Sequence, residues 1–176
     1  MNVALHIPRL SEMAARQAWL SDPATMAYNR GRDLGGAEGY HPDTGCIDFP
    51  RENWRWWRQI WLNNAPDFYA AYLRNAETGE FVGEVSWYRE EERFVAGILI
   101  AAPYRGRGLC APALRALMEY AFRRGDVPSL HCDLSPDNAP ALRGYAHAGF
   151  RPIGSAGGMI QLACTREEWA FIERSL

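Results

Sequence analysis

The chain has 176 residues and a formal net charge of -2, with 48% hydrophobic and 23% charged residues. These values are typical of a globular domain with its own core, so we expect residues 1–176 to form a single domain. The charge excludes a dedicated nucleic-acid-binding protein, and the sequence holds no apolar stretch of about 20 residues, as a membrane span requires. The N-terminal residues show no signal pattern, so we expect a cytoplasmic protein that binds neither nucleic acid nor membrane.

The four cysteines are widely separated along the chain, at Cys46, Cys110, Cys132 and Cys164. They form no C-x-x-C pair, which argues against a zinc site and against a disulfide framework. We therefore expect four reduced and mostly buried thiols, and no metal.

Hydrophobic periodicity divides the chain into alternating strands and helices. The first part predicts a strand at 3–7, a helix that begins at Ser11 and is interrupted by Pro23, an irregular glycine-rich segment at 31–50, and a helix with Trp54, Trp57 and Trp61 on one face. We expect these three tryptophans to lie in the core, with an aromatic platform for the substrate as the alternative. The second part predicts strands at 68–73, 80–88 and 94–101, a helix at 108–124, a strand at 129–134, a helix at 139–148 with Asn138 as N-cap, strands at 150–153 and 159–163, and a helix after a capping box at Thr165. This order predicts an α/β fold with a mixed, mostly antiparallel central sheet and helices on both faces.

The junction between the expected strand 94–101 and the expected helix 108–124 carries the most informative motif, Tyr104-Arg105-Gly106-Arg107-Gly108-Leu109-Cys110. Glycines let a ligand approach the backbone, a helix N-terminus offers free N–H groups, and guanidinium groups bind phosphate oxygens. A phosphate-binding turn is one interpretation, and an ordinary turn with solvated arginines is the other. A P-loop needs a lysine, which this chain lacks, and the dinucleotide fingerprint G-x-G-x-x-G has Ala111 at its last position.

Two motifs resemble those of the GNAT superfamily of acetyl-CoA-dependent N-acetyltransferases. The segment Arg105-x-x-Gly108-x-Cys110 resembles the signature R/Q-x-x-G-x-G/A, and the next helix and strand carry a pattern similar to the family's, Asn138-x-x-Ala141-x-x-x-Tyr145-x-x-x-Gly149-Phe150. The resemblance covers roughly residues 68–163. Two features depart from the family pattern: Cys110 replaces the usual Gly or Ala beside the pyrophosphate, and residues 94–100 lack the glutamate that many members carry.

The resemblance implies acetyl-CoA as co-substrate and no metal. In this family, the strand before the signature parts from its neighbour and offers its backbone to the pantetheine arm of the cofactor, and Gly97 would mark a bulge that opens the sheet here. A buried central strand is the alternative. The residues implied for cofactor binding are Ile98, Leu99, Ile100, Arg105, Gly106, Arg107, Gly108, Leu109, Cys110 and Asn138.

Acetyl transfer to an amine requires a base for the amine and a proton for the leaving thiolate. The resemblance implies Tyr145 as the proton donor, although a core tyrosine is the alternative. For the base we expect Glu84, on the neighbouring strand, with His131 and His147 as alternatives. The segment 31–50 is expected to contact the acceptor, and its acidic residues favour a cationic one.

The sequence therefore predicts an N-acetyltransferase that moves the acetyl group from acetyl-CoA to a primary amine by direct attack in a ternary complex. The acceptor is expected to be a small molecule, a peptide or a protein terminus. The alternative is a non-catalytic acyl-CoA-binding sensor or regulatory module, suggested by the missing strand carboxylate. Dimers are common in the family, which leaves a homodimer as an alternative to a monomer.

Overall fold

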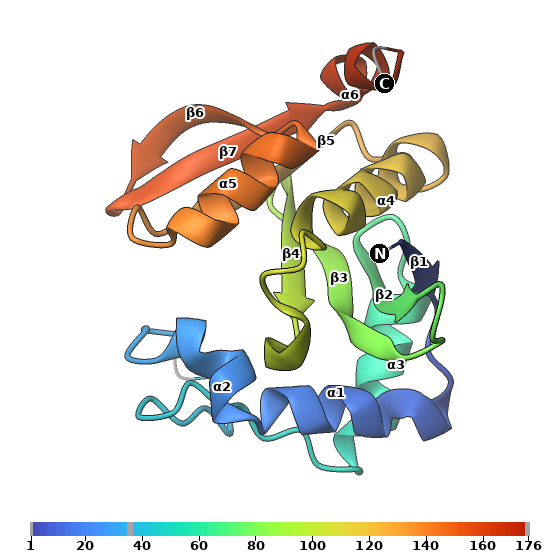
Figure 1. Ribbon diagram of the computed structural model, residues 1–176, viewed down its shortest axis with the longest axis vertical. Helices are drawn as coiled ribbons and strands as arrows, with labels where there is room; N and C mark the ends of the chain where they lie inside the picture. The colour runs from blue at the N-terminus through green and yellow to red at the C-terminus, as the bar shows by residue number, and fades with distance from the viewer. Residues whose placement is uncertain (1, 35–36, 175–176) are drawn as a thin grey trace.

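The computed structural model describes residues 2–34 and 37–174, and its centre is a seven-stranded mixed sheet (Figure 1). The strands run in the order β1-β2-β3-β4-β5-β7-β6, and every neighbouring pair is antiparallel except β4 and β5. Their bounds are β1 Val3–His6, β2 Phe68–Asn75, β3 Phe81–Glu90, β4 Arg93–Ile100, β5 Ser129–Leu134, β6 Arg151–Ala156 and β7 Met159–Thr165. The predicted mixed, mostly antiparallel sheet is confirmed.

Helices cover both faces of this sheet, as expected. Helices α4 (Cys110–Arg123), α5 (Ala139–Ala148) and α6 (Arg166–Glu173) pack on one face, whose core includes Trp87, Leu117 and Trp169. Helices α1 (Met13–Leu20) and α3 (Asn53–Asn63) contribute to a second core on the other face. In Figure 1, α1 and the short α2 (Pro23–Met26) lie below the sheet, and α5 crosses in front of β7.

Local sequence signals account for where the helices begin and end. The helix expected from Ser11 is divided into the short 3-10 helix η1 (Leu10–Glu12), α1 and α2, because Pro23 starts a new helix that Asp22 caps. Asn138 caps α5 and Gly149 ends it with a φ of 117°, a left-handed value that favours glycine. These caps and the capping box at Thr165 are confirmed.

The tryptophan stripe of α3 lies in the second core, as the helical spacing predicts. Trp54 and Trp57 are buried, and Trp61 is half-buried and stacks on Trp57 with ring centroids 5.8 Å apart. Met13 and Tyr72 are fully buried beside them. This core holds α1 and α3 against one face of the central sheet.

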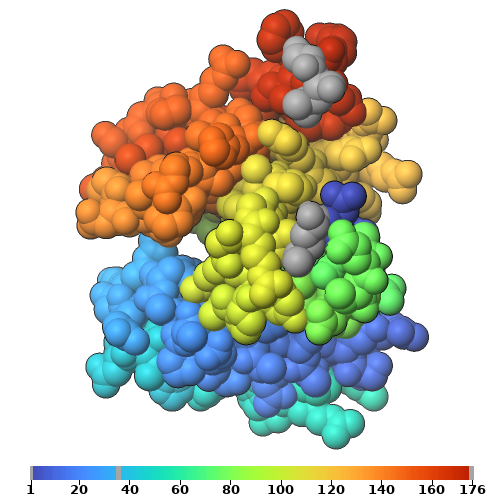
Figure 2. Space-filling view, in the orientation of Figure 1, coloured from blue at the N-terminus to red at the C-terminus, as the bar shows by residue number. Residues whose placement is uncertain are grey.

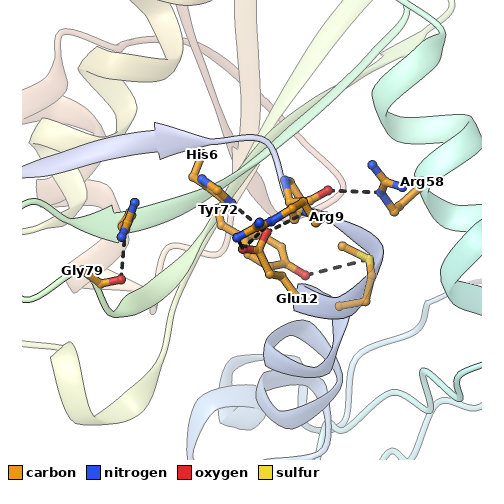
Figure 3. Close-up of polar contacts among 9 residues, drawn as sticks. His6, Arg9, Glu12, Arg58, Tyr72 and Gly79 are labelled. Atoms are coloured by element: carbon orange, nitrogen blue, oxygen red, sulfur yellow. Dashed lines mark hydrogen bonds and ion pairs between the residues drawn. The ribbon is translucent and has the colours of Figure 1, made fainter.

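A polar junction ties the start of α1 to the first strand (Figure 3). The Glu12 carboxylate accepts hydrogen bonds from the Arg9 backbone N–H at 2.7 Å and pairs with His6 Nε2 at 2.8 Å. Burial opposes ionisation of this carboxyl, but the bonds from His6 and Arg9 prevail and lower its pKa to about 2. Arg58 of α3 donates to the Pro8 carbonyl, so α3 is attached to the same junction.

The four cysteines are free thiols, as expected, and Cys46, Cys132 and Cys164 are buried. Within the described part of the chain, no cluster of three or more His, Cys, Asp or Glu side chains is arranged to hold a metal ion. Across the same residues, no helix combines the length and the apolar character needed to cross a membrane.

The irregular segment at 31–50 folds back on α2. Among its described residues, Tyr40 donates its hydroxyl to the Asn29 carbonyl, His41 pairs with Asp48 at 2.9 Å, and Cys46 and Phe49 enter the second core. Two of its glycines, Gly35 and Gly36, lie outside the described residues.

Candidate active site

The sheet opens between its fourth and fifth strands. Strands β4 and β5 are parallel, and their pairing is confined to Val95 and His131, beyond which the two strands separate. Figure 2 shows a hollow at this level, between the α5 and β6 region above and α2 below, with the central strands at its floor. The parting of the two strands, implied by the resemblance, is present.

A bulge at Gly97 does not cause this opening, and that expectation is wrong. The ladder between β3 and β4 runs without a register shift from Gly83 opposite Ile100 to Glu90 opposite Arg93, with Gly97 opposite Ser86. Because β4 keeps its pairing with β3 without a register shift, the opening lies between β4 and β5 alone.

The register of β4 determines which of its backbone groups face the opening. The Ala101 N–H bonds to the Val82 carbonyl, so residue 101 and every second residue before it direct their backbone groups to β3. Leu99 therefore bonds to β3 opposite Glu84 and offers no backbone group to the opening, unlike the expectation for it. Ile98 and Ile100 direct theirs toward β5, into the space between the parting strands.

Side chains occupy the two ends of this open edge. At the narrow end, next to the point where β4 and β5 still pair, the Tyr145 hydroxyl donates to the Ala96 carbonyl at 3.3 Å. At the wide end, Arg105 Nε donates to the Ile100 carbonyl at 2.9 Å. Between them lie the N–H and C=O of Ile98 and the N–H of Ile100, which can bond to an extended ligand that carries amide groups.

The wide end leads into the glycine turn before α4. Gly106 and Gly108 have φ values of 74° and 73°, and a Cβ built on either glycine would meet no atom within 4 Å. Leu109 is the N-cap of α4 and makes no side-chain capping bond, so the amides of the first helical turn are open to an external acceptor. Left-handed glycines, open space and a helix N-terminus together fit an anion such as a pyrophosphate.

The two arginines of this turn differ in what they contact. Arg107 is exposed, and its guanidinium lies 5.5 Å from the centre of the Tyr104 ring. The guanidinium of Arg105 donates to three backbone carbonyls, those of Ile100, Ala24 and Thr25. Both side chains are exposed, so the difference lies in their contacts: Arg107 is placed as a phosphate ligand would be, whereas Arg105 directs its donors to the protein's own backbone.

Cys110 and Asn138 both have structural partners. The Cys110 side chain packs so closely on α5 that a Cβ at Gly144 would lie 2.4 Å from its sulfur, which explains how a residue larger than Gly or Ala fits here. Burial raises the pKa of the Cys110 thiol to about 11, so it is a poor nucleophile. Asn138 Oδ1 accepts the Ala141 N–H at 3.2 Å, as expected of a helix cap, and its amide nitrogen still has donors to offer.

Tyr145 reaches the narrow end of the opening from α5. Its side chain is 2% exposed and packs edge-on against Phe150. Burial raises its pKa well above the ordinary value, and the neighbouring Cys132 thiol adds to the shift. The phenol therefore keeps its proton at neutral pH and acts as a donor.

Glu84 lies on the opposite face of the sheet from Tyr145. Its carboxylate accepts from Arg16 Nε of α1 at 3.0 Å, and both side chains are at least 85% buried, with 12% and 15% exposed. Arg16 also lies over the rings of Phe49 and Trp57, at 4.5 and 4.6 Å. Glu84 is thus ion-paired with Arg16 in a mostly buried position.

Tyr28 interacts electrostatically with both Glu84 and Tyr145. Tyr28 lies after α2 and is 42% exposed; the burial of the rest of its side chain and the charge of Glu84 raise its pKa, and Tyr28 in turn contributes to the raised pKa of Tyr145. Neither Tyr28 nor Arg16 could be singled out from the sequence, because both lie in a segment without a motif and reach the site only in the fold.

The two histidines differ in their surroundings. His131 stands at the point where β4 and β5 part, and its Nε2 bonds to Ser129 Oγ at 2.9 Å. Its Nδ1 is buried without a partner among the described residues, and burial lowers its pKa. His147 is exposed in the last turn of α5, away from this point.

Comparison with known proteins identifies the class to which this fold and site belong. The family model of the acetyltransferase (GNAT) domain matches residues 3–151, so the chain belongs to the GNAT family. The aminoglycoside N(6')-acetyltransferase type 1 of Klebsiella pneumoniae is 31% identical over 114 residues, which cover 60% of this chain and 54% of that protein. A kanamycin resistance protein of Rhizobium radiobacter is 34% identical over 88 residues, 46% of this chain and 82% of that one.

Solved structures share the fold across nearly the whole chain. The spermidine N-acetyltransferase of Vibrio cholerae in complex with CoA and spermine has a TM-score of 0.72 at 12% identity, covering 96% of this chain and 98% of that one. The aminoglycoside acetyltransferase AAC(6')-Ib, in complex with coenzyme A and kanamycin, has a TM-score of 0.71 at 18% identity, covering 98% and 99%. At these identities the likeness concerns the fold. The chain matches about half the length of the aminoglycoside N(6')-acetyltransferase relatives.

Proposed function

We propose that this protein is an acetyl-CoA-dependent N-acetyltransferase, working as one domain over residues 1–176, that acetylates a primary amine by direct attack in a ternary complex. The observation that carries the proposal is the open edge of β4, which leads from the Tyr145 hydroxyl to the glycine turn at the start of α4. One end fits an acyl thioester and the other fits a pyrophosphate.

The described residues fit the cofactor along this whole path. The amides of Gly106, Gly108 and the first turn of α4 would hold the pyrophosphate, and Arg107 would add a charge-assisted bond to a phosphate. The Ile98 carbonyl and the Ile100 N–H would bond to the pantetheine amides, and Asn138 has amide N–H groups for the same arm. Acetyl-CoA, when bound, supplies an acetyl group activated as a thioester.

The chain's own residues then manage charge and protons at the narrow end. A backbone N–H of β4 that faces the opening, from Ile98, would polarise the thioester carbonyl. Tyr145 keeps its proton and would donate it to the departing thiolate. To do so, its hydroxyl would exchange the hydrogen bond to the Ala96 carbonyl for one to the thiolate. Glu84 would take the proton of the substrate amine through the Tyr28 hydroxyl or a water, because its negative charge acts on Tyr28.

For the acceptor we propose a primary amine on a small molecule, a peptide or a protein terminus. Relatives named for aminoglycosides and spermidine support an amine acceptor as a class. The alternative, a non-catalytic acyl-CoA-binding module, is not favoured, because the relatives are named as acetyltransferases. Tyr145 and the ion-paired Glu84 are also groups that a sensor would not need.

The test is release of free thiol from acetyl-CoA in the presence of a panel of primary amines, with calorimetric titration of coenzyme A in parallel. We expect coenzyme A to bind and at least one amine to accelerate thiol release above the rate without amine. Binding of coenzyme A with no acceleration by any amine, peptide or protein N-terminus would instead identify a binding module.

A further inference from the structure

We propose that Arg105 is a positioning residue that fastens the cofactor strand to the acceptor side of the site, and that it does not bind the cofactor phosphates. The inference rests on the proposed function, because it assigns the two sides of the opening to cofactor and acceptor. It separates two arginines that the signature sequence presents as equivalent.

The guanidinium of Arg105 is committed to three acceptors in two segments. Nε donates to the Ile100 carbonyl at 2.9 Å, at the end of β4, and Nη1 donates to the Ala24 carbonyl at 2.9 Å, in α2. Nη2 donates to the carbonyl of Thr25, the next residue of α2. A planar guanidinium has five N–H donors in a fixed fork, so three carbonyls in this arrangement determine its orientation.

A second contact joins the same two segments beside Arg105. Thr25 Oγ1 accepts the Ala102 N–H at 2.9 Å, and its own proton goes to the Asp22 carboxylate at 2.6 Å. Thr25 is 1% exposed, so water does not compete for these bonds. The chain leaving β4 is therefore fixed to α2 by a buried hydroxyl and by a cation, across about 80 residues of sequence.

Each side of this connection matters for the proposed reaction. On the cofactor side, the bond from Arg105 to the Ile100 carbonyl fixes the backbone of Ile100, and the N–H of the same residue faces the opening. On the acceptor side, α2 borders the hollow seen in Figure 2, and Tyr28 follows its last residue by two positions. Arg105 thereby keeps the wall that carries Tyr28 at a fixed distance from the strand that would hold the thioester.

The matched pair Arg105→Gln and Arg107→Gln tests this assignment within one loop. For Arg105→Gln we expect the KM for the amine to rise by about tenfold or more, while the Kd for coenzyme A changes by less than about twofold and keeps its salt dependence. For Arg107→Gln we expect weaker coenzyme A binding and a shallower salt dependence, with little change in the amine KM. Arg105→Lys should not restore the amine KM, because an ammonium cannot span three carbonyls.

Hydrogen exchange provides a readout that does not need turnover. In Arg105→Gln the amides of residues 22–32 should exchange faster than in the wild type, whereas Arg107→Gln and the surface variant Arg89→Gln should leave them unchanged. If Arg105→Gln fails to fold, Thr25→Val breaks the adjacent contact from the other side and should give the same rise in KM and in exchange.

Several results would overturn the proposal. Salt-dependent loss of coenzyme A affinity in Arg105→Gln would make Arg105 a phosphate ligand. A lower melting temperature with unchanged amine KM and unchanged exchange at 22–32 would make it a merely structural contact. If the wild type acetylates no amine, the proposed function fails, while the exchange and the coenzyme A titrations still decide the connection itself.

Discussion

Replacing Tyr145 by Phe removes one hydroxyl from the narrow end of the opening and keeps the ring that packs on Phe150. The hydroxyl donates to the Ala96 carbonyl, and the residue is 2% exposed. If this hydroxyl protonates the leaving thiolate, its loss should lower kcat by about 10² to 10⁴-fold, the usual contribution of a general acid. Coenzyme A affinity should stay the same, because the pyrophosphate and pantetheine contacts are unchanged.

The same substitution has a cost in stability that can be separated from its effect on catalysis. The Ala96 carbonyl loses a buried hydrogen bond, which lowers the free energy of unfolding by about 1 to 3 kcal/mol. In a domain of this size that corresponds to a melting temperature lower by roughly 2 to 12 °C. Ordinary domains are stable by about 5 to 15 kcal/mol, so we expect the variant to remain folded at 25 °C, where its kcat can be measured directly.

The assay is pre-steady-state thiol release with a saturating amine, so that chemistry is separated from product release. Tyr120→Phe is the matched control, since Tyr120 lies on α4 and stacks on Tyr69 at 4.3 Å, away from Ala96. A single-turnover rate in Tyr145→Phe equal to that of the wild type would refute the assignment and leave Tyr145 as a core residue.

The remaining predictions concern the turn, the α4–α5 contact and the two carboxylates. Gly108→Val should weaken coenzyme A binding by about tenfold or more in titration calorimetry with an unchanged circular dichroism spectrum, and an unchanged Kd would contradict the pyrophosphate placement. Gly144→Ala should lower the melting temperature because its Cβ would lie 2.4 Å from the Cys110 sulfur, and adding Cys110→Ala should recover most of the loss; no recovery would contradict this contact. Glu84→Gln should lower kcat by about 10²-fold or more without weakening coenzyme A binding, and an unchanged kcat would exclude it as the base. The pKa of Glu12 is lowered to about 2 in the fold, so its stabilisation is present above pH 4.5 and is lost as the pH falls toward 2; in urea unfolding, Glu12→Gln should be less stable than the wild type at pH 7 but nearly equal at pH 2, and an equal difference at both would contradict the shift.

The elements of the fold could be predicted from the sequence because their signals are local. The caps at Asn138 and Thr165 lie within three residues of the amides they satisfy, and the tryptophan stripe of α3 repeats within two helical turns. The break of the first helix at Pro23 could also be anticipated from the proline alone. Such signals depend only on neighbours in the chain, so periodicity and composition are enough to find them.

The arrangement of the site could be predicted only in outline. The glycine turn is a local motif, but the roles of its two arginines depend on contacts with α2 about 80 residues earlier. Arg16 meets Glu84 across 68 residues, and no pattern in the sequence marks either as the partner of the other. The divergence of β4 and β5 depends on how these two strands pair, which no local pattern encodes. Gly97 suggested a bulge, but it pairs with Ser86 of β3 without a register shift.

The open edge of β4 is short, and its length restricts what it can bind. An exposed strand edge invites pairing with any extended chain, which makes a long free edge a hazard. Here the Tyr145 hydroxyl takes the Ala96 carbonyl and Arg105 takes the Ile100 carbonyl, so only the groups of Ile98 and the N–H of Ile100 remain. A strand of another protein would find too few partners, whereas a slender arm with two amides finds enough. Under the proposed function, the residues that close the ends of this edge would help to select a pantetheine-like ligand over a polypeptide.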